Sequence, residues 1–564
     1  MSSLDERSEG RTRVAVAAAL LIACYGAVFL AIPGGTFYTT DAGANYLLSR
    51  RVAERGLGLD VELPFTKLAG APVPLEMAAV RTLRTPPPHM FLRRYGEGWT
   101  LTYPPLFPAV SGWLLALFGV AGLRLLPAIA AALAAWVASG LVAAGEGRAE
   151  TLLLFGLATP LLFYAHVYWG HSLGALLVLG ALALWASGRP LAAGSCCAMA
   201  VTVRTECLAA VALVPAAAAL AAGAVRPMAR AATRYAMGAA LVLLPLAVFQ
   251  WHAYGTPAGA HVASIDPATN TVTAEAAAEG GPKVARNLFH YLFRNYRMLD
   301  GMAAVLAAAG MCGWAAAAAA PGATRAVLLA VAAGGGLVSM LFAVLVPGQY
   351  APGLMLVMPL ATLAPLGLRE SLRSGHPSAR FLAAFALLDL LAVAALAPRG
   401  GWQWGPRYLL PIVPLVAWLG WQARPAAPRA TLVLAVASLV LQATSVRDLR
   451  LQLTAQQELV ESVAGSDPLV TDVWFLSWQL MPALWGRDFL HADTPAQLGT
   501  VLSAASERGR ASVRHVSGSW KHGEPGGAWD AELTRLGWRV SAARELRFPS
   551  GDRLALRRLE RPGR

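Results

Sequence analysis

The sequence predicts an all-α polytopic membrane protein with a small soluble α/β domain at its C-terminus. The residue types AVILMFWYC make up 56% of the 564 residues, charged residues make up 14%, and the mean hydropathy is +0.52. A soluble chain usually carries about 25% charged residues. The apolar residues also come in blocks of roughly twenty, the length that crosses a hydrocarbon core of about 30 Å. Together these observations exclude a water-soluble fold.

The apolar blocks predict about 13 to 14 transmembrane helices. The first block, 14–33, is too long for the apolar part of a secretory signal. We therefore expect an uncleaved first helix whose start is held in the cytoplasm by Arg11 and Arg13. The predicted spans are 14–33, 105–121, 122–144, 151–168, 171–187, 190–205, 206–224, 235–254, 299–320, 325–347, 350–368, 380–397, 407–423 and 430–446.

Basic residues gather in the short loops 226–234, 369–380 and 424–429. Under the positive-inside rule, such loops lie in the cytoplasm. The net charge of +14 therefore reflects membrane topology, and we expect no nucleic-acid partner.

Long polar stretches occupy 34–104, 255–298 and everything after about 447. Counting spans from the cytoplasmic loops places all three on the outer side, which is the periplasmic or exterior face of a bacterial inner membrane. The count is off by one between 105 and 225. One segment there is re-entrant, or one helix has been divided into two.

The predicted domains are a transmembrane domain at 1–446 and an outer α/β domain at 447–564. All five cysteines lie in apolar blocks, so we expect no disulfide framework. The tail has no glycine-rich phosphate loop, and we expect no nucleotide site. Its predicted elements are strands within 467–474, 510–518 and 553–560 and a helix at 494–509.

The first outer loop carries the sequence TFYTTDAGANYLLSRR, with Asp41 a few residues beyond the first span. A carboxylate at the mouth of the membrane can take a proton from a hydroxyl group as a general base. The alternative is that Asp41 caps the helix that follows. We expect that helix to lie along the membrane surface, with Arg50, Arg51 and Arg55 available to lipid phosphates.

A second arginine candidate lies late in the chain. Arg407 stands in GWQWGPRY, at the predicted outer end of a span and beside Trp402 and Trp404. Arginine suits phosphate because its planar fork donates paired hydrogen bonds and stays charged. The alternative is an interfacial anchor in an aromatic belt.

Other ionisable residues fall within or next to apolar blocks. Arg204 and Glu206 are expected near a helix end or in protein surroundings, and Asp389 is either a packed polar contact or a proton site. His166 and His171 are poorly spaced for a metal, and we expect a binding or orienting role for His171.

The end of the middle outer loop, 283–297, predicts a basic amphipathic helix that includes Arg286. Such a helix attracts an anionic lipid or binds no specific ligand.

The order of these features resembles the superfamily of polytopic glycosyltransferases of the GT-C type. Its members use polyprenyl-phosphate sugars and include protein O-mannosyltransferases and aminoarabinose transferases. The resemblance rests on Asp41 after the first span, on YPP at 103–105 and on RYLLP at 407–411, and it covers roughly 14–225 and 399–446.

The resemblance implies a transfer of sugar from a polyprenyl-phosphate donor to a glycan, lipid or protein acceptor at the outer face. Asp41 matches the catalytic base, and Tyr103 and Arg407 match positions near the carrier phosphate, with Arg50 or Arg286 as helpers. Where many members have a second acidic residue, this chain has His166 and His171. No cofactor is implied, and a role for a divalent cation stays open.

Two other functions remain. A transporter or flippase of lipid-linked sugars would explain the many spans and the buried ionisable residues, but we find no internal repeat in the sequence. A non-catalytic scaffold for envelope assembly would make the tail the working part, and it predicts that a change at Asp41 has no effect.

Overall fold

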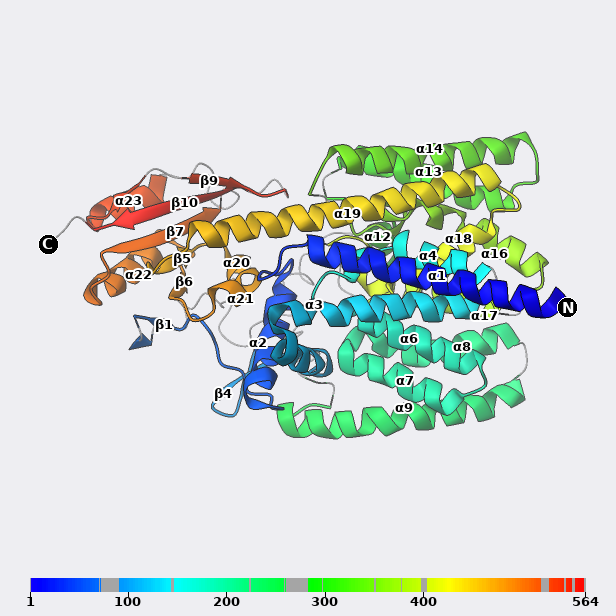
Figure 1. Ribbon diagram of the computed structural model, residues 1–564, viewed down its shortest axis with the longest axis horizontal. Coiled ribbons are helices and arrows are strands. Elements are labelled where there is room, and N and C mark those ends of the chain that lie inside the picture. Colours follow the sequence, from blue (N-terminus) through cyan, green and yellow to red (C-terminus); the bar gives the residue numbers. More distant parts are fainter. Residues whose placement is uncertain are drawn as a thin grey trace. The chain divides into compact units, whose positions relative to one another are not determined.

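A computed structural model provides the fold of the chain (Figure 1). It describes residues 2–69, 71–72, 91–143, 147–222, 225–257, 259, 283–296, 298–348, 351–376, 378–396, 403–518, 527–541, 544–549 and 553–561.

The described residues contain eight helices that are long and apolar enough to cross a membrane. Two shorter apolar helices, α6 (His171–Ala186) and α7 (Pro190–Val203), accompany them. The polytopic membrane protein predicted from the sequence is thereby confirmed. The eight candidate spans lie in α1 (Ser2–Ala31), α3 (Leu106–Val142), α8 (Leu208–Ala222, with the preceding turn η2, Thr205–Cys207), α9 (Val225–Tyr254), α13 (Asp300–Ala318), α14 (Ala323–Leu345), α17 (Ala379–Leu396) and α19 (Pro428–Ser462).

Three of the predicted spans are wrong as continuous helices. Proline is the physical reason, because it lacks the N–H group that a helix interior needs. The span 151–168 is divided by Pro160 into α4 (Gly147–Leu157) and α5 (Leu161–Tyr164), and 350–368 becomes α15 (Leu354–Val357), η3 (Pro359–Leu363) and α16 (Ala364–Arg373). The span 407–423 likewise becomes η4 (Arg407–Leu409) and α18 (Val413–Gln422).

The chain divides into two compact units. The first contains Met1–Leu30 and Arg124–Arg447, and the second contains Ala31–Leu123 and Asp448–Arg564. The second unit therefore combines the first outer loop with the C-terminal tail.

Helices of the first unit approach one another closely through small residues, as expected inside a bilayer. A Cβ added to Gly194 of α7 would lie 1.9 Å from the carbonyl oxygen of Tyr235, and one added to Gly238 of α9 would lie 1.9 Å from that of Leu191. The helices α13 and α14, drawn in green, form a hairpin joined by a short loop (Figure 1). Because the carbonyl oxygens that face Gly194 and Gly238 belong to the opposite helix, the backbones of α7 and α9 are in direct contact.

The C-terminal part of the second unit is a mixed β-sheet with helices against it. Its strands are ordered β6 (Phe489–His491), β5 (Leu469–Thr471), β7 (Ser512–Gly518), β10 (Arg553–Glu560) and β8 (Arg539–Val540), and β9 (Arg544–Arg547) also pairs with β10. The strand β5 runs parallel to β6 and β7, whereas β10 runs antiparallel to β7.

The elements predicted for the tail are confirmed. Thr494 caps α22 (Pro495–Glu507) by accepting a hydrogen bond from the backbone of Gln497, and α23 (Gly527–Arg535) packs beside α22. The buried core joins Val470, Leu498 and Trp529 to Leu68 of the first outer loop.

Candidate functional site

Asp41 lies in the first turn of α2 (Thr40–Arg55), in the second unit. The N-cap is Thr39, whose hydroxyl accepts a hydrogen bond from the backbone N–H of Ala42 at 3.3 Å. The interpretation of Asp41 as the cap is therefore wrong, because Thr39 supplies that oxygen. The Asp41 residue is 8% exposed, and its backbone carbonyl accepts a hydrogen bond from Asn45. Its carboxylate is thus held near a helix N-terminus, where the helix dipole favours negative charge.

The start of α2 is fixed by close contact with α20 (Trp474–Gln479). A Cβ added to Gly43 would lie 2.0 Å from the carbonyl oxygen of Trp478, so only glycine fits there. Two hydrogen bonds secure the same region: Gln479 donates through Nε2 to the carbonyl of Tyr38, and its own carbonyl accepts from Phe37 N–H. The tail therefore positions the turn that carries Asp41.

The arginines of α2 lie beside acidic partners of the same unit. Arg50 has an aromatic neighbour in addition to its acidic partner, since its guanidinium lies 4.0 Å from the ring centroid of Trp485. The hydrogen bond from Arg51 holds the pKa of Asp60 below its usual range. The pairs are Arg50–Glu54 at 2.5 Å, Arg51–Asp60 at 3.1 Å and Arg55–Glu62 at 3.2 Å.

Tyr103 follows β4 (Gly98–Leu101) in the second unit, just before α3 begins. Its ring is buried and stacks on Phe91, with the ring centroids 5.9 Å apart. The backbone N–H of Thr102 donates to the carbonyl of Phe91, which fixes the entry to the helix.

The candidates His171 and Arg407 belong to the first unit and lie at its breaks in helical structure. The Tyr164 hydroxyl donates to the carbonyl of Gly405 at 3.3 Å, and Gly405 N–H donates to the carbonyl of Ala351. The side-chain amide of Gln442 donates to the carbonyl of Val357 at 2.6 Å. Irregular backbone at membrane depth is tolerated where it is buried in protein or lines a cavity. These hydrogen bonds link α5 to the chain just before η4 and just before α15, and they anchor α15 to α19.

Arg407 begins η4 and has its guanidinium against aromatic rings. Its Cζ is 5.0 Å from the ring centroid of Trp169 and 4.8 Å from that of Tyr408, and Nη2 donates to the Tyr408 hydroxyl at 2.8 Å. Stacking of this kind holds an arginine in one orientation.

His171 begins α6 and is surrounded by the same aromatic side chains. Its ring centroid lies 5.0 Å from that of Trp169, 5.8 Å from that of Tyr164 and 6.1 Å from that of Tyr408. None of these three rings was predicted as a site residue. The only signal for Trp169 was its place in YWGH, two residues before His171.

A carboxylate and a second arginine complete the cluster. Glu206 Oε1 lies 3.6 Å from His171 Nδ1 and accepts a hydrogen bond from Arg204 Nε at 2.7 Å. Arg204 is buried in the bend between α7 and η2. The expectation that Arg204 and Glu206 lie near a helix end is confirmed. We call Arg407, His171, Glu206 and Arg204, with the rings of Trp169 and Tyr408, the arginine–histidine cluster.

Arg286 is half-buried in α12 (Lys283–Phe293), which is amphipathic as predicted. The helix is fixed to α17 by a hydrogen bond from Asn287 to the carbonyl of Ala394. Trp402 and residues 260–282 of the middle loop lie outside the described residues. Asp389 is buried within α17.

The structure thus brings His171 and Arg407 together in the first unit and places Asp41, Arg50 and Tyr103 in the second. Among the described residues, no group of three or more His, Cys, Asp or Glu residues could hold a metal ion.

No protein-family model and no curated protein matches the sequence. Solved structures to which this chain is similar include ArnT from Cupriavidus metallidurans bound to undecaprenyl phosphate, at 12% identity over 95% of this chain and 97% of that one, with a TM-score of 0.48. Another is the archaeal oligosaccharyltransferase AglB from Archaeoglobus fulgidus with an inhibitory peptide and a dolichol-phosphate, at 11% identity over 97% and 74% of the two chains and a TM-score of 0.47.

A third similar structure is the arabinofuranosyltransferase AftD from Mycobacteria, at 16% identity over 98% of this chain and 40% of that one, with a TM-score of 0.36. At these scores and identities, the likeness assigns neither an activity nor a site residue to this chain.

Proposed function

We propose that the protein is a membrane glycosyltransferase of the GT-C type that moves a sugar from a polyprenyl-phosphate donor to an envelope acceptor. The arginine–histidine cluster carries this proposal. It combines a fixed arginine, flat aromatic surfaces and a buried histidine within an apolar helical unit. An anionic phosphate attached to an apolar chain and a sugar fits that combination better than a free ion does.

Arg407 holds the donor phosphate in this proposal. Its orientation by Trp169 and Tyr408 leaves little freedom to lose when the phosphate binds. The phosphate gains negative charge as the sugar leaves, and a guanidinium already in place stabilises that charge. Tyr103, Arg50 and Arg286 are proposed to assist at the phosphate, and His171 is proposed to contact the sugar or the acceptor.

Asp41 acts as the general base. The acceptor hydroxyl oxygen forms a bond to the anomeric carbon while the bond from that carbon to the carrier phosphate breaks. The proton of the hydroxyl passes to the Asp41 carboxylate, and the electron pair of the broken bond leaves with the phosphate. Attack from the side opposite the leaving phosphate inverts the anomeric configuration.

We place the reaction at the outer face of a bacterial inner membrane. The positive-inside rule puts the loop of Asp41 on the periplasmic or exterior side. The acceptor is a glycan, a lipid or a protein of the envelope, and neither a nucleotide nor a cofactor is needed.

The second candidate function is a transporter of lipid-linked sugars. The broken helices α5, α15 and η4 favour it, since discontinuous helices form many transporter sites. Transport moves the donor across the membrane with its sugar still attached. Glycosyl transfer cleaves the sugar–phosphate bond and leaves the carrier phosphate behind.

The experiment uses purified protein in lipid nanodiscs, a panel of radiolabelled polyprenyl-phosphate sugars and a membrane extract as the source of acceptor. We expect wild-type protein to release carrier phosphate and to label an acceptor, and Arg407→Gln to lose about a hundredfold or more of that activity. Arg424→Gln, which removes an exposed arginine paired with Glu150, is the matched control and should retain activity. Donor translocation in proteoliposomes without cleavage would favour the transporter and refute the transferase.

A further inference from the structure

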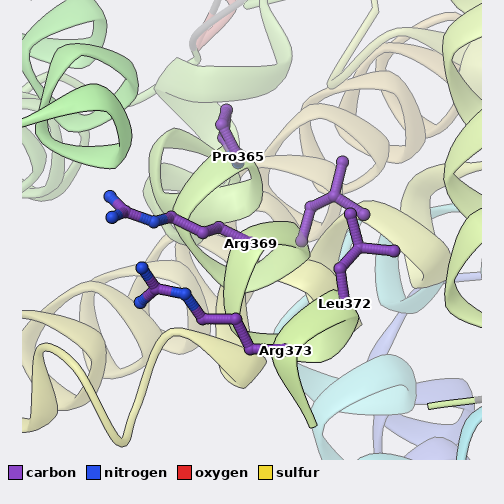
Figure 2. Close-up of a pocket in the computed structure, with 5 residues that line it drawn as sticks. Pro365, Arg369, Leu372 and Arg373 are labelled. Atoms are coloured by element: carbon purple, nitrogen blue, oxygen red, sulfur yellow. The ribbon is translucent and has the colours of Figure 1, made fainter. Parts of the chain in front are cut away.

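A shallow hollow lies along α16, well separated in sequence from the arginine–histidine cluster. Its lining residues are Pro365, Leu368, Arg369, Leu372 and Arg373, and its volume is about 410 Å³. Figure 2 shows the guanidinium groups of Arg369 and Arg373 extending to the same side of the helix, with Leu372 on the opposite side. The hollow therefore has a cationic side and an apolar side.

The cationic side lies at the end of a candidate membrane span. Arg369 Nη1 donates to the carbonyl oxygen of Ala317 at 2.5 Å and is 3.5 Å from that of Ala319. Those carbonyls belong to the C-terminal end of α13, where the apolar span ends at Ala318. We therefore expect the hollow at the depth where the hydrocarbon core gives way to lipid headgroups.

Arginine is in excess over acid at this place. Arg325, which is buried, donates through Nη2 to the same Ala319 carbonyl at 2.6 Å. Arg373 pairs with Glu370 through Nη1 at 3.0 Å. In the described part of the chain, two of these three arginines bond backbone carbonyls and one pairs with a carboxylate.

Each lining arginine keeps donors available. The described residues that Arg369 and Arg373 contact all engage Nη1, which leaves Nη2 and Nε of both guanidiniums for another acceptor. A phosphodiester oxygen accepts such paired donors well. The neighbouring Leu368 and Leu372 offer apolar contact to the first carbons of an acyl chain.

We propose that this hollow binds the phosphate headgroup of an anionic phospholipid. The arginines hold the phosphate at the membrane interface, and the leucines contact the lipid's acyl chains. By the positive-inside rule the loop 369–380 is cytoplasmic, so the lipid comes from the inner leaflet. The site is independent of the proposed donor site, and binding there does not require glycosyl transfer.

The test uses full-length protein in phosphatidylcholine nanodiscs that contain a small fraction of phosphatidylglycerol with a photoreactive acyl chain. Crosslinked residues are located by peptide mass spectrometry. We expect labelling within 364–373, with competition by unlabelled phosphatidylglycerol but not by phosphatidylcholine. Loss of one arginine should weaken labelling about fivefold, and Arg369→Gln with Arg373→Gln should weaken it about 25-fold.

Control variants test whether reduced labelling comes from lost surface charge in general or from misfolding. The pair Arg380→Gln and Arg429→Gln removes the same charge from two exposed arginines on the same predicted face and should leave labelling unchanged. Because Arg369 also binds the end of α13, Arg373→Gln alone and the charge-keeping Arg369→Lys test the site in proteins that fold.

Equal labelling of wild type and the double variant would overturn the proposal, as would equal competition by phosphatidylcholine. Loss of labelling in millimolar inorganic phosphate would assign the hollow to free phosphate and overturn the lipid assignment.

Discussion

Arg204 donates through Nε to Oε1 of Glu206 at 2.7 Å, in the bend where α7 gives way to the turn η2. Glu206 Oε1 also lies 3.6 Å from Nδ1 of His171. One carboxylate oxygen therefore balances the charge of a buried arginine and lies close to the histidine of the proposed site.

Removal of Glu206 should destabilise the protein. Glu206→Ala leaves the Arg204 guanidinium, 7% exposed at its side chain, without its carboxylate, at an expected cost of about 3 kcal/mol in the free energy of unfolding. Glu206→Gln keeps a hydrogen-bond acceptor and should cost less. Unfolding in a denaturing detergent measures both.

The double variant Arg204→Met with Glu206→Leu removes both charges of the pair at once. Because neither charge is then left buried alone, it should be more stable than Glu206→Ala. A double variant as unstable as the sum of the two single changes would contradict the assignment of the pair.

The contact between α7 and α9 should tolerate no added methyl group. Gly194→Ala and Gly238→Ala each place a Cβ 1.9 Å from a carbonyl oxygen of the facing helix, so we expect each to cost about 2 kcal/mol or more. Gly334→Ala in α14, where nothing lies within 4 Å of the added Cβ, is the matched control and should be neutral or stabilising. Thermal unfolding in detergent compares the three.

Gly43→Ala tests whether the tail positions Asp41. The added Cβ would lie 2.0 Å from the Trp478 carbonyl and should displace the first turn of α2. A displacement of this order is expected to reduce glycosyl transfer by the folded protein about a hundredfold. Gly26→Ala in α1 has open space around its Cβ and serves as the control. Unchanged transfer in Gly43→Ala would show that catalysis does not depend on this contact with the tail.

Composition and periodicity predicted much of the fold. The long apolar helices and the strands of the tail follow directly from runs of apolar residues and from alternation, since both signals are local. The broken segments were not predicted, because 151–168, 350–368 and 407–423 are apolar enough to pass as spans. Their prolines break the helix, and distant partners such as Gln442 satisfy the freed backbone groups.

The candidate site was predicted only in part. Arg407 and His171 were chosen for their chemistry, and the structure places them in one cluster. The pairing of Glu206 with His171 joins two helices and leaves no spacing signal in the sequence. The acidic partners of Arg50, Arg51 and Arg55 were likewise not expected.

In the proposed reaction, Asp41 removes a proton from the acceptor during glycosyl transfer. The most direct measurement is single-turnover transfer by Asp41→Asn in nanodiscs, beside wild type and with donor binding measured on the same samples. The asparagine keeps the shape of the side chain and removes the base. We predict transfer slower by roughly a thousandfold with donor binding unchanged. Transfer within a few-fold of wild type would contradict the account.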